Sequence, residues 1–165
     1  MIRVLNTQDV EAYQKIRLEA LRANPEAFGS TYEREKGFTL EEVCHRIAPQ
    51  PGKFTLGAFI EERLAGIATF VREDGPKTMH KGNVYGMYVS TENRGLGIGR
   101  KLLEELIKKA QQLDGVEQIT LTVVQGNEKA KALYANMGFT VFGIEKNALK
   151  VNEVYYDEEW MVYFL

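Results

Sequence analysis

Apolar side chains recur along this chain with two different periods, and the changes between them predict its secondary structure. A short apolar strand at residues 2–5 is followed by a stripe at helical spacing, made up of Val10, Tyr13, Ile16, Leu18 and Leu21. The stripe predicts a helix that begins near Thr7 and ends before Pro25, because proline disfavours helical geometry in the residue preceding it. Residues 26–38 show no period and predict a loop.

The rest of the chain alternates between helical patterns and apolar strands. Thr39 and Glu42 form a capping-box pattern at the start of a helix that should end near Ile47. Strands are predicted at residues 54–60 and 64–71, which form a hairpin, and at 83–89, 118–124, 140–144 and 155–163. Helices are predicted at residues 98–113 and 127–137, the second ending at Gly138 as a left-handed cap.

This order of elements predicts an α/β fold in the mixed-sheet sense. The strand at 83–89, the helix at 98–113 and the strand at 118–124 form a crossover, so the two strands should be parallel and the connection right-handed. Hairpin-type connections elsewhere predict antiparallel pairs. The chain has 165 residues and no linker or repeat, so residues 1–165 should form a single domain.

Candidate chemistry is concentrated between the strand at 83–89 and the helix that follows it. The connecting segment reads Arg94-Gly95-Leu96-Gly97-Ile98-Gly99-Arg100. Three glycines at alternate positions let the backbone curl and expose successive N–H groups. These donors join the unpaired N–H groups and the positive dipole end of the helix. The segment therefore predicts a binding site for an anion such as a phosphate or pyrophosphate.

Two common nucleotide-binding patterns do not fit this segment. The dinucleotide fingerprint needs its third glycine at position 100 or 102, where the chain has Arg100 and Leu102. A P-loop needs Gly-Lys followed by Ser or Thr, which occurs nowhere in the sequence. The pattern that remains is Arg94-x-x-Gly97-x-Gly99. About thirty residues later it is followed by Asn127-x-x-Ala130-x-x-Leu133-Tyr134-x-x-x-Gly138-Phe139.

These two patterns, with the strand at 118–124 between them, resemble those of the GCN5-related N-acetyltransferases (the GNAT superfamily). The resemblance extends less specifically over residues 2–165. It implies a mixed, mostly antiparallel central sheet with flanking helices, in which the two parallel strands splay apart near their C-terminal ends. It also implies acetyl-CoA as cosubstrate, its pantetheine arm hydrogen-bonding in the gap like an extra strand.

The resemblance assigns cofactor contacts to particular positions. Met87 and Val89 would offer the strand edge, and residues 94–100 would hold the pyrophosphate, namely Arg94, Gly95, Leu96, Gly97, Ile98, Gly99 and Arg100. Arg94 fits either a phosphate contact or a role in fixing the turn. Arg100 lies in the first helical turn, where its charge opposes the dipole, which favours a phosphate contact. Asn127 fits a helix N-cap as well as a cofactor contact.

Tyr134 is the best single candidate for catalysis. The matching tyrosine in the family points at the cofactor sulfur, and the amine attacks the thioester directly in a ternary complex. A phenol with a pKa of about 10 can protonate a departing thiolate with a pKa of about 8.5 only modestly uphill. A core role is the alternative, because Ala130, Leu133 and Met137 lie on the same apolar face.

The resemblance implies an amine-bearing acceptor, either a small molecule or a protein amine. Tyr32 and Glu33 lie in the loop before the second helix and would suit a cationic acceptor. Some relatives carry a glutamate on the motif strand near Asn83, but this chain has no acid between residues 81 and 90. The general base would then have to be another residue, and the candidates are Glu33, Glu35 and His80.

Composition limits the partners. A formal net charge of −2 argues against a nucleic-acid binder. No apolar run approaches the ~20 residues of a membrane helix, and the N-terminus lacks a signal-peptide core. Cys44 has no partner for an internal disulfide and is predicted to pack in the core. We expect a cytoplasmic enzyme without a metal centre, and a homodimer is one option for its assembly.

Two other functions would use the same glycine segment. A non-catalytic acyl-CoA sensor would bind the cofactor tightly but release no thiol when an acceptor is added. An enzyme that binds a nucleotide or another phosphate compound would prefer NAD or ATP to coenzyme A.

Overall fold

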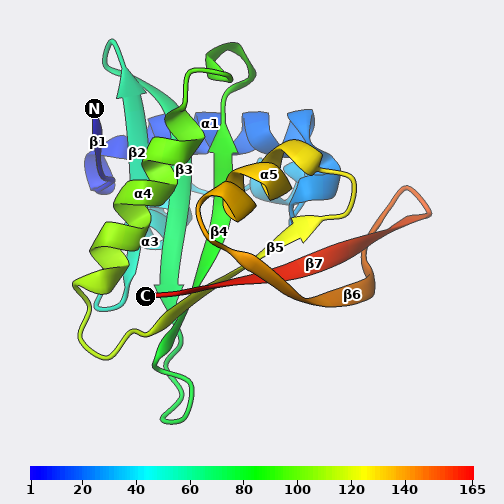
Figure 1. Cartoon of the computed structure of the whole chain (residues 1–165). Helices are drawn as coiled ribbons and strands as arrows, with labels where there is room; N and C mark the ends of the chain where they lie inside the picture. The colour runs from blue at the N-terminus through cyan, green and yellow to red at the C-terminus, as the bar shows by residue number, and fades with distance from the viewer.

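The computed structural model describes all 165 residues and shows one seven-stranded sheet with helices on both faces (Figure 1). The strands are β1 (Ile2–Val4), β2 (Lys53–Ile60), β3 (Arg63–Arg72), β4 (Lys81–Val89), β5 (Gln118–Val124), β6 (Thr140–Val151) and β7 (Val154–Phe164). The helices are α1 (Val10–Ala23), α2 (Tyr32–Glu35), α3 (Leu40–Ile47), α4 (Ile98–Gln111) and α5 (Glu128–Asn136). Short 3₁₀ turns lie at Thr7–Asp9, Pro25–Ala27 and Thr91–Asn93.

The sheet has the order β1-β2-β3-β4-β5-β7-β6, and β4 with β5 is its one parallel pair. This confirms the predicted mixed, mostly antiparallel sheet. The parallel pairing joins only Lys81–Asn83 to Gln118–Thr120, although both strands continue further. The Thr120 hydroxyl donates to the side-chain oxygen of Asn83 at the last paired position. Beyond it the two strands part, as the resemblance implied.

A β-bulge re-aims β4 where it leaves β5. Ile67 of β3 faces Tyr88, but Thr69 faces Tyr85, so β4 carries one extra residue between these pairs. Gly86 lies in the bulge with φ +59°, a left-handed conformation that a side chain would strain. The bulge turns the C-terminal half of β4 toward the gap.

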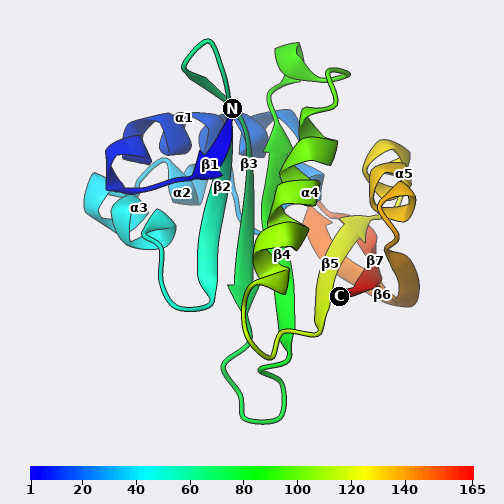
Figure 2. The ribbon, with the colours of Figure 1, turned by 60° about the vertical axis from the view of Figure 1, so that its left-hand side comes forward.

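Two apolar cores lie on opposite faces of the sheet. Figure 2 shows the helices that cover them, α4 on one face and α1 with α3 on the other. On one face α4 buries the stripe that its spacing predicts, namely Leu102, Leu103, Leu106, Ile107 and Ala110. On the other face α1 and α3 pack through Val10, Tyr13, Ile16, Val43 and Ile47. Burying each large aliphatic side chain stabilises the fold by about 1.5–3 kcal/mol, so these helices hold the β1–β4 part of the sheet firmly from both faces.

Several local predictions are confirmed. The Thr39–Glu42 capping box forms, the Asn127 side chain accepts from the Ala130 N–H at 3.3 Å, and Gly138 has φ +101°. The hairpin turn at residues 61–62 has positive φ at both positions. Cys44 is half-buried against the α1–α3 core. No helix is both long and apolar enough to span a membrane.

Other local predictions are wrong. Leu18 is only half-buried, and Arg17 is the buried residue of α1 at that level. Residues 26–38 are not all loop, because Thr31 caps the short helix α2 through the Arg34 N–H. The strand predicted at 140–144 continues to Val151. Its side chains are mostly exposed on both faces, so it lacks the alternation that reveals a half-buried strand.

Candidate active site

The glycine segment has the curled backbone that its sequence predicts. Gly95 and Gly97 have φ +79° and +73°, and Gly97 is the N-cap of α4. A glycine cap offers no side-chain oxygen to the first N–H groups of the helix. No atom lies within 4 Å of the place where a Cβ would stand on either residue. The start of the helix is therefore free of side chains at these two positions, which leaves room for a pyrophosphate.

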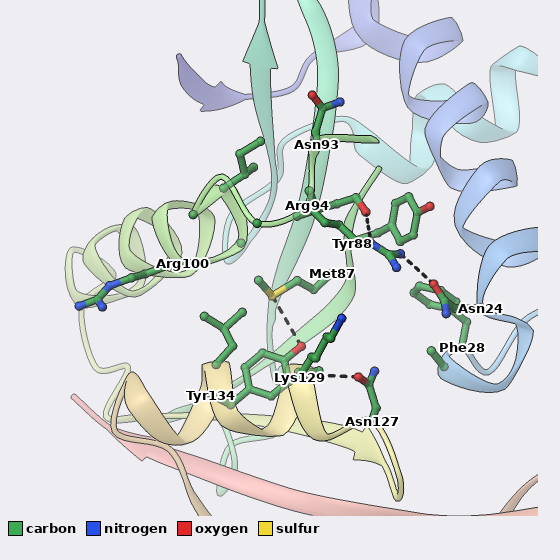
Figure 3. A pocket seen from close by; sticks show the side chains of 18 residues that line it. Asn24, Phe28, Met87, Tyr88, Asn93, Arg94, Arg100, Asn127, Lys129 and Tyr134 are labelled. Carbon is green, nitrogen blue, oxygen red and sulfur yellow. Dashed lines mark hydrogen bonds between the residues drawn. The ribbon is translucent and has the colours of Figure 1, made fainter. Parts of the chain in front are cut away.

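A cavity of about 400 Å³ lies between β4, α4, α5 and the segment after α1 (Figure 3). It brings together ten of the eleven residues that the sequence assigned to the cofactor, namely Met87, Val89, Arg94, Gly95, Gly97, Ile98, Gly99, Arg100, Asn127 and Tyr134. Leu96, the remaining one, points to solvent with 62% of its surface exposed. A long, narrow arm could lie along the β4 side of this cavity, at Met87, Tyr88 and Val89.

The two arginines of the segment are both held by the protein. Arg94 donates through Nε to the Val89 carbonyl at 3.1 Å and through Nη2 to the Asn24 side chain at 2.9 Å. It therefore fixes the turn after β4 to the end of α1. Arg100 donates to Glu104 at 2.9 Å and, in Figure 3, extends away from Met87 and Tyr134. Its charge in the first helical turn is balanced by Glu104, so that position alone no longer argues for a phosphate contact.

Lys129 is a cation at this cavity that the sequence analysis missed. It lies at the start of α5, its side chain is exposed, and it forms no ion pair. Figure 3 shows it between Tyr134 and Asn127, on the side facing Asn24. In the sequence, Lys129 looks like an ordinary surface lysine on a helix. It becomes a candidate anion contact only in the fold, where it lines the same cavity as the glycine segment.

Tyr134 reaches the centre of the gap from α5. The residue is only 8% exposed, and burial raises the pKa of its phenol to about 12. The hydroxyl donates to Met87 Sδ at 3.6 Å, and a thioether sulfur is a weak acceptor. The phenol is therefore protonated at any physiological pH and has no strong acceptor of its own.

A second cavity of about 280 Å³ meets the first at Tyr134. Ala27, Phe28, Met87 and Tyr134 line both cavities. The second one continues past the bulge of β4 toward α1, β5 and β7. The two cavities therefore adjoin, and Tyr134 is among the residues that lie between them. Two reactants, one in each cavity, would meet there.

The residues predicted for the acceptor side lie elsewhere. Tyr32 accepts a hydrogen bond from Arg22 at 2.6 Å and lines a separate hollow along α1. Glu33 is 75% exposed and pairs with Lys36. His80 precedes β4 and lies at the opposite end of that strand from Val89, where its carbonyl accepts from the Glu117 N–H. None of them lines either cavity.

Glu35 is a structural carboxylate. It is fully buried and accepts hydrogen bonds from Arg17 Nε at 3.0 Å, Arg17 Nη2 at 2.9 Å and Arg46 Nη1 at 2.6 Å. Burial alone would raise the pKa of Glu35, but the two arginines outweigh it and lower the pKa to about 2. A carboxylate that has so low a pKa and lines neither cavity is a poor proton acceptor.

Comparison with known proteins agrees with this arrangement. The family model of the acetyltransferase (GNAT) domain matches residues 2–160. The chain belongs to the GNAT family. L-amino acid N-acetyltransferase AaaT of Escherichia coli K12 is 28% identical to this family member over 163 residues, which cover 98% of this chain and 95% of that protein.

Solved GNAT structures superpose over the whole chain. The ribosomal-protein-alanine N-acetyltransferase of Brucella melitensis has a TM-score of 0.84 and 26% identity, covering 100% of this chain and 99% of that one. A phosphinothricin acetyltransferase of Sinorhizobium meliloti, solved in complex with AcCoA, has a TM-score of 0.85 and 22% identity, covering 100% and 88%. The fold and the acyltransferase class of this GNAT protein are thereby established.

Proposed function

We propose that this protein transfers the acetyl group of acetyl-CoA to a primary amine by direct attack in a ternary complex. The observation that carries the proposal is the pair of adjoining cavities, with a buried, protonated Tyr134 that lines both of them. A ternary complex requires two reactants to meet at one point, and two cavities that share Tyr134 would bring them together there.

The larger cavity suits acetyl-CoA. The N–H groups around Gly95 and Gly97 would hold the pyrophosphate, with Lys129 as a nearby cation. The β4 edge around Met87 and Val89 would receive the pantetheine arm, although Arg94 shares the Val89 carbonyl. Acetyl-CoA supplies an activated acyl group, because a thiolate leaves more readily than an amine or alkoxide.

Tyr134 would assist the departure of the thiolate. The pKa of Tyr134 is about 12, whereas that of a thiol is about 8.5. Full proton transfer from the phenol to the thiolate is therefore unfavourable by more than three pKa units. The phenol therefore acts first as a hydrogen-bond donor to the sulfur, and the proton that finally neutralises the thiolate comes from the attacking amine. A donor aimed at developing charge in a buried site stabilises the transition state.

The fold leaves the acceptor open to several amines. Relatives and structural neighbours are named for amino acids, mycothiol and a ribosomal protein. Thiol release from acetyl-CoA that depends on an added amine, measured over a panel of amines, would establish the transfer. Tight binding of acetyl-CoA without such release over the whole panel would instead favour the non-catalytic sensor.

Gly99→Val should weaken acetyl-CoA binding by at least tenfold. Gly99 lies in the first turn of α4, and a Cβ there would stand 3.3 Å from Leu133, 3.6 Å from Met87 and 3.8 Å from Val89. All three line the larger cavity, so a branched side chain fills it. Calorimetric titration with acetyl-CoA measures the change.

Gly143→Val is the matched control for this test. Gly143 lies in β6, has no atom within 4 Å of its Cβ position, and lines neither cavity. Its affinity for acetyl-CoA should equal that of the wild type. A folded Gly99→Val protein with unchanged affinity would contradict the assignment of the larger cavity to the cofactor.

A further inference from the structure

The smaller cavity carries charges of both signs that acetyl-CoA binding leaves unexplained. Arg17 reaches it from α1 and Glu158 reaches it from β7. The two side chains form no ion pair with each other, and Glu158 forms none with any other residue. Both charges therefore remain available to a molecule that lies between them.

Arg17 belongs to a cluster with a net positive charge. Arg17 and Arg46 share the single carboxylate of Glu35, which leaves one positive charge unbalanced. Nε and Nη2 of Arg17 are bound to Glu35, whereas Nη1 makes no hydrogen bond. Nη1 lies beside the bulge of β4, 3.6 Å from the Cβ position of Gly86, which lines the cavity. A charged donor with no acceptor at a cavity wall favours an anionic ligand.

Ser30 adds a second unused donor on the same side. It lines the cavity, and its hydroxyl oxygen is buried without a hydrogen bond. The hydroxyl lies near enough to Glu35 to help lower the pKa of that carboxyl, but not in hydrogen-bonding geometry. Buried hydroxyls normally find a partner, so an incoming acceptor group would satisfy it.

Glu158 is a carboxylate at the same cavity that has no positively charged partner. Its one hydrogen-bond contact is the Thr122 hydroxyl at 3.5 Å, the limit of such a bond. Burial and, next, the negative charge of Glu145 on β6 raise the pKa of Glu158. The other ionisable groups at the cavity are Arg17 on α1, Tyr85 on β4 and Tyr134 on α5. A half-buried carboxylate without a cation favours a positively charged ligand or a proton.

We propose that the smaller cavity binds the acceptor as a zwitterion, with the ammonium group at Glu158 and a neighbouring carboxylate at Arg17 and Ser30. The acceptor class is thus a free α-amino acid or a close analogue. This inference rests on the proposed acetyl transfer and specifies its acceptor. Volume agrees, because about 280 Å³ is enough to hold one amino acid.

The same arrangement gives Glu158 a catalytic role. Its carboxylate accepts one proton from the bound ammonium, which leaves the nitrogen lone pair free. The nitrogen then forms a bond to the acetyl carbon, and the carbon–sulfur bond breaks with its electron pair on sulfur. The second nitrogen proton neutralises the thiolate, which Tyr134 has held by a hydrogen bond. The proton on Glu158 returns to solvent.

Amines other than α-amino acids interact less favourably with the charges of Arg17 and Glu158. A polyamine would place a second cation near Arg17 and the positive cluster. A protein N-terminus or a lysine side chain has no adjacent carboxylate, so Arg17 Nη1 and the Ser30 hydroxyl would remain without an acceptor. Leaving buried donors unpaired makes a polar site discriminate strongly against ligands that lack the matching group.

The first test compares acids with their amides on the wild-type protein. The twenty common L-amino acids are assayed for thiol release, and the best substrate is compared with its α-carboxamide. We expect kcat/KM to fall at least tenfold with the amide. The amide lacks the neighbouring negative charge, so its amine is less basic and a larger fraction of it is neutral at a given pH. A shortage of neutral amine therefore cannot explain a fall in kcat/KM. Equal activity with acid and amide would overturn the carboxylate site.

The second test replaces Glu158 with glutamine. We expect kcat/KM for the amino acid to fall at least tenfold at pH 7. The difference in kcat/KM between Glu158→Gln and the wild type should become smaller as the pH rises through the pKa of the amine. The amine then loses its proton to solvent and no longer needs Glu158 as a base. Glu158 makes no ion pair, so thermal stability should not fall. A Glu158→Gln protein with a wild-type pH profile would contradict the role of Glu158.

Asp157→Asn is the matched control. Asp157 is the preceding residue on β7, pairs with the exposed Lys146, and lines neither cavity. It should leave kcat/KM within about twofold of the wild type. Activity with peptides or polyamines but not with amino acids would disprove the zwitterion site and leave acetyl transfer intact. Absence of activity with every amine would contradict the proposed function itself.

Discussion

Tyr134→Phe should lower kcat by about 10²-fold or more and leave the Kd for acetyl-CoA within about twofold. The ring keeps its packing between α5 and the sheet, since only the hydroxyl is removed. That hydroxyl has one partner in the folded protein, the weakly accepting sulfur of Met87 at 3.6 Å. Losing it costs the fold little. It removes the one side-chain donor at the junction of the two cavities, where the leaving sulfur must lie.

The measurement is single-turnover kinetics, in which chemistry limits the rate, alongside calorimetric titration. Tyr163→Phe is the control, because Tyr163 packs in the same core against Phe139 but lines neither cavity. It should keep wild-type kcat. Because the pKa of Tyr134 is about 12, the wild-type rate should also show no fall due to this residue up to pH 10. A Tyr134→Phe protein with the wild-type single-turnover rate would reduce Tyr134 to core packing.

The cofactor site could be predicted from the sequence because its signals are local. Left-handed conformations at Gly95 and Gly97, the Asn127 cap and the buried stripe of α4 each depend on residues within a few positions of one another. The crossover rule then fixes which strands are parallel. The splay itself follows from pairing that stops at Asn83 and Thr120, which no single segment encodes. It could be stated only by resemblance.

The acceptor side could not be read in this way because its residues come from four distant segments. Arg17 is on α1, Ser30 precedes α2, Gly86 is in the bulge of β4 and Glu158 is on β7. Each is ordinary in its own context: an arginine in a helix, a loop serine, a strand glycine, a glutamate in an acidic run. Helical periodicity placed Leu18 in the core, but the buried residue is Arg17, because Glu35 from another helix supplies its counter-charge. An ion pair between remote elements overrides the local pattern.

Glu35 was the residue whose role changed most when the fold was known. As an acid in an apparent loop it was a candidate base, whereas in the fold it joins α1, α2 and α3 through two arginines. It also holds Nε and Nη2 of Arg17, which directs the free Nη1 toward the bulge of β4. Glu35 is thus a positioning residue for the acceptor cavity as well as a structural one.

Glu35→Gln should lower the free energy of unfolding by about 3–5 kcal/mol, because it leaves Arg17 buried and Arg46 half-buried without their shared counter-charge. For a domain of this size such a loss lowers the Tm by on the order of 10 °C. Glu33→Gln, two residues away on α2, is the matched control. Glu33 is 75% exposed and pairs only with Lys36, so its removal should cost less than about 1 kcal/mol. Urea unfolding at pH 7 measures both.

The difference between wild type and Glu35→Gln should also depend on pH in a defined direction. The pKa of Glu35 is about 2 in the folded protein, against about 4.3 for an unfolded glutamate. The ion pairs therefore contribute their full stability above pH 4.3, and that contribution is lost as the pH falls toward 2. The two unfolding free energies should converge over this window. A gap that stays constant from pH 6 to pH 2.5 would show that packing of the side chain, not its charge, holds the three helices together.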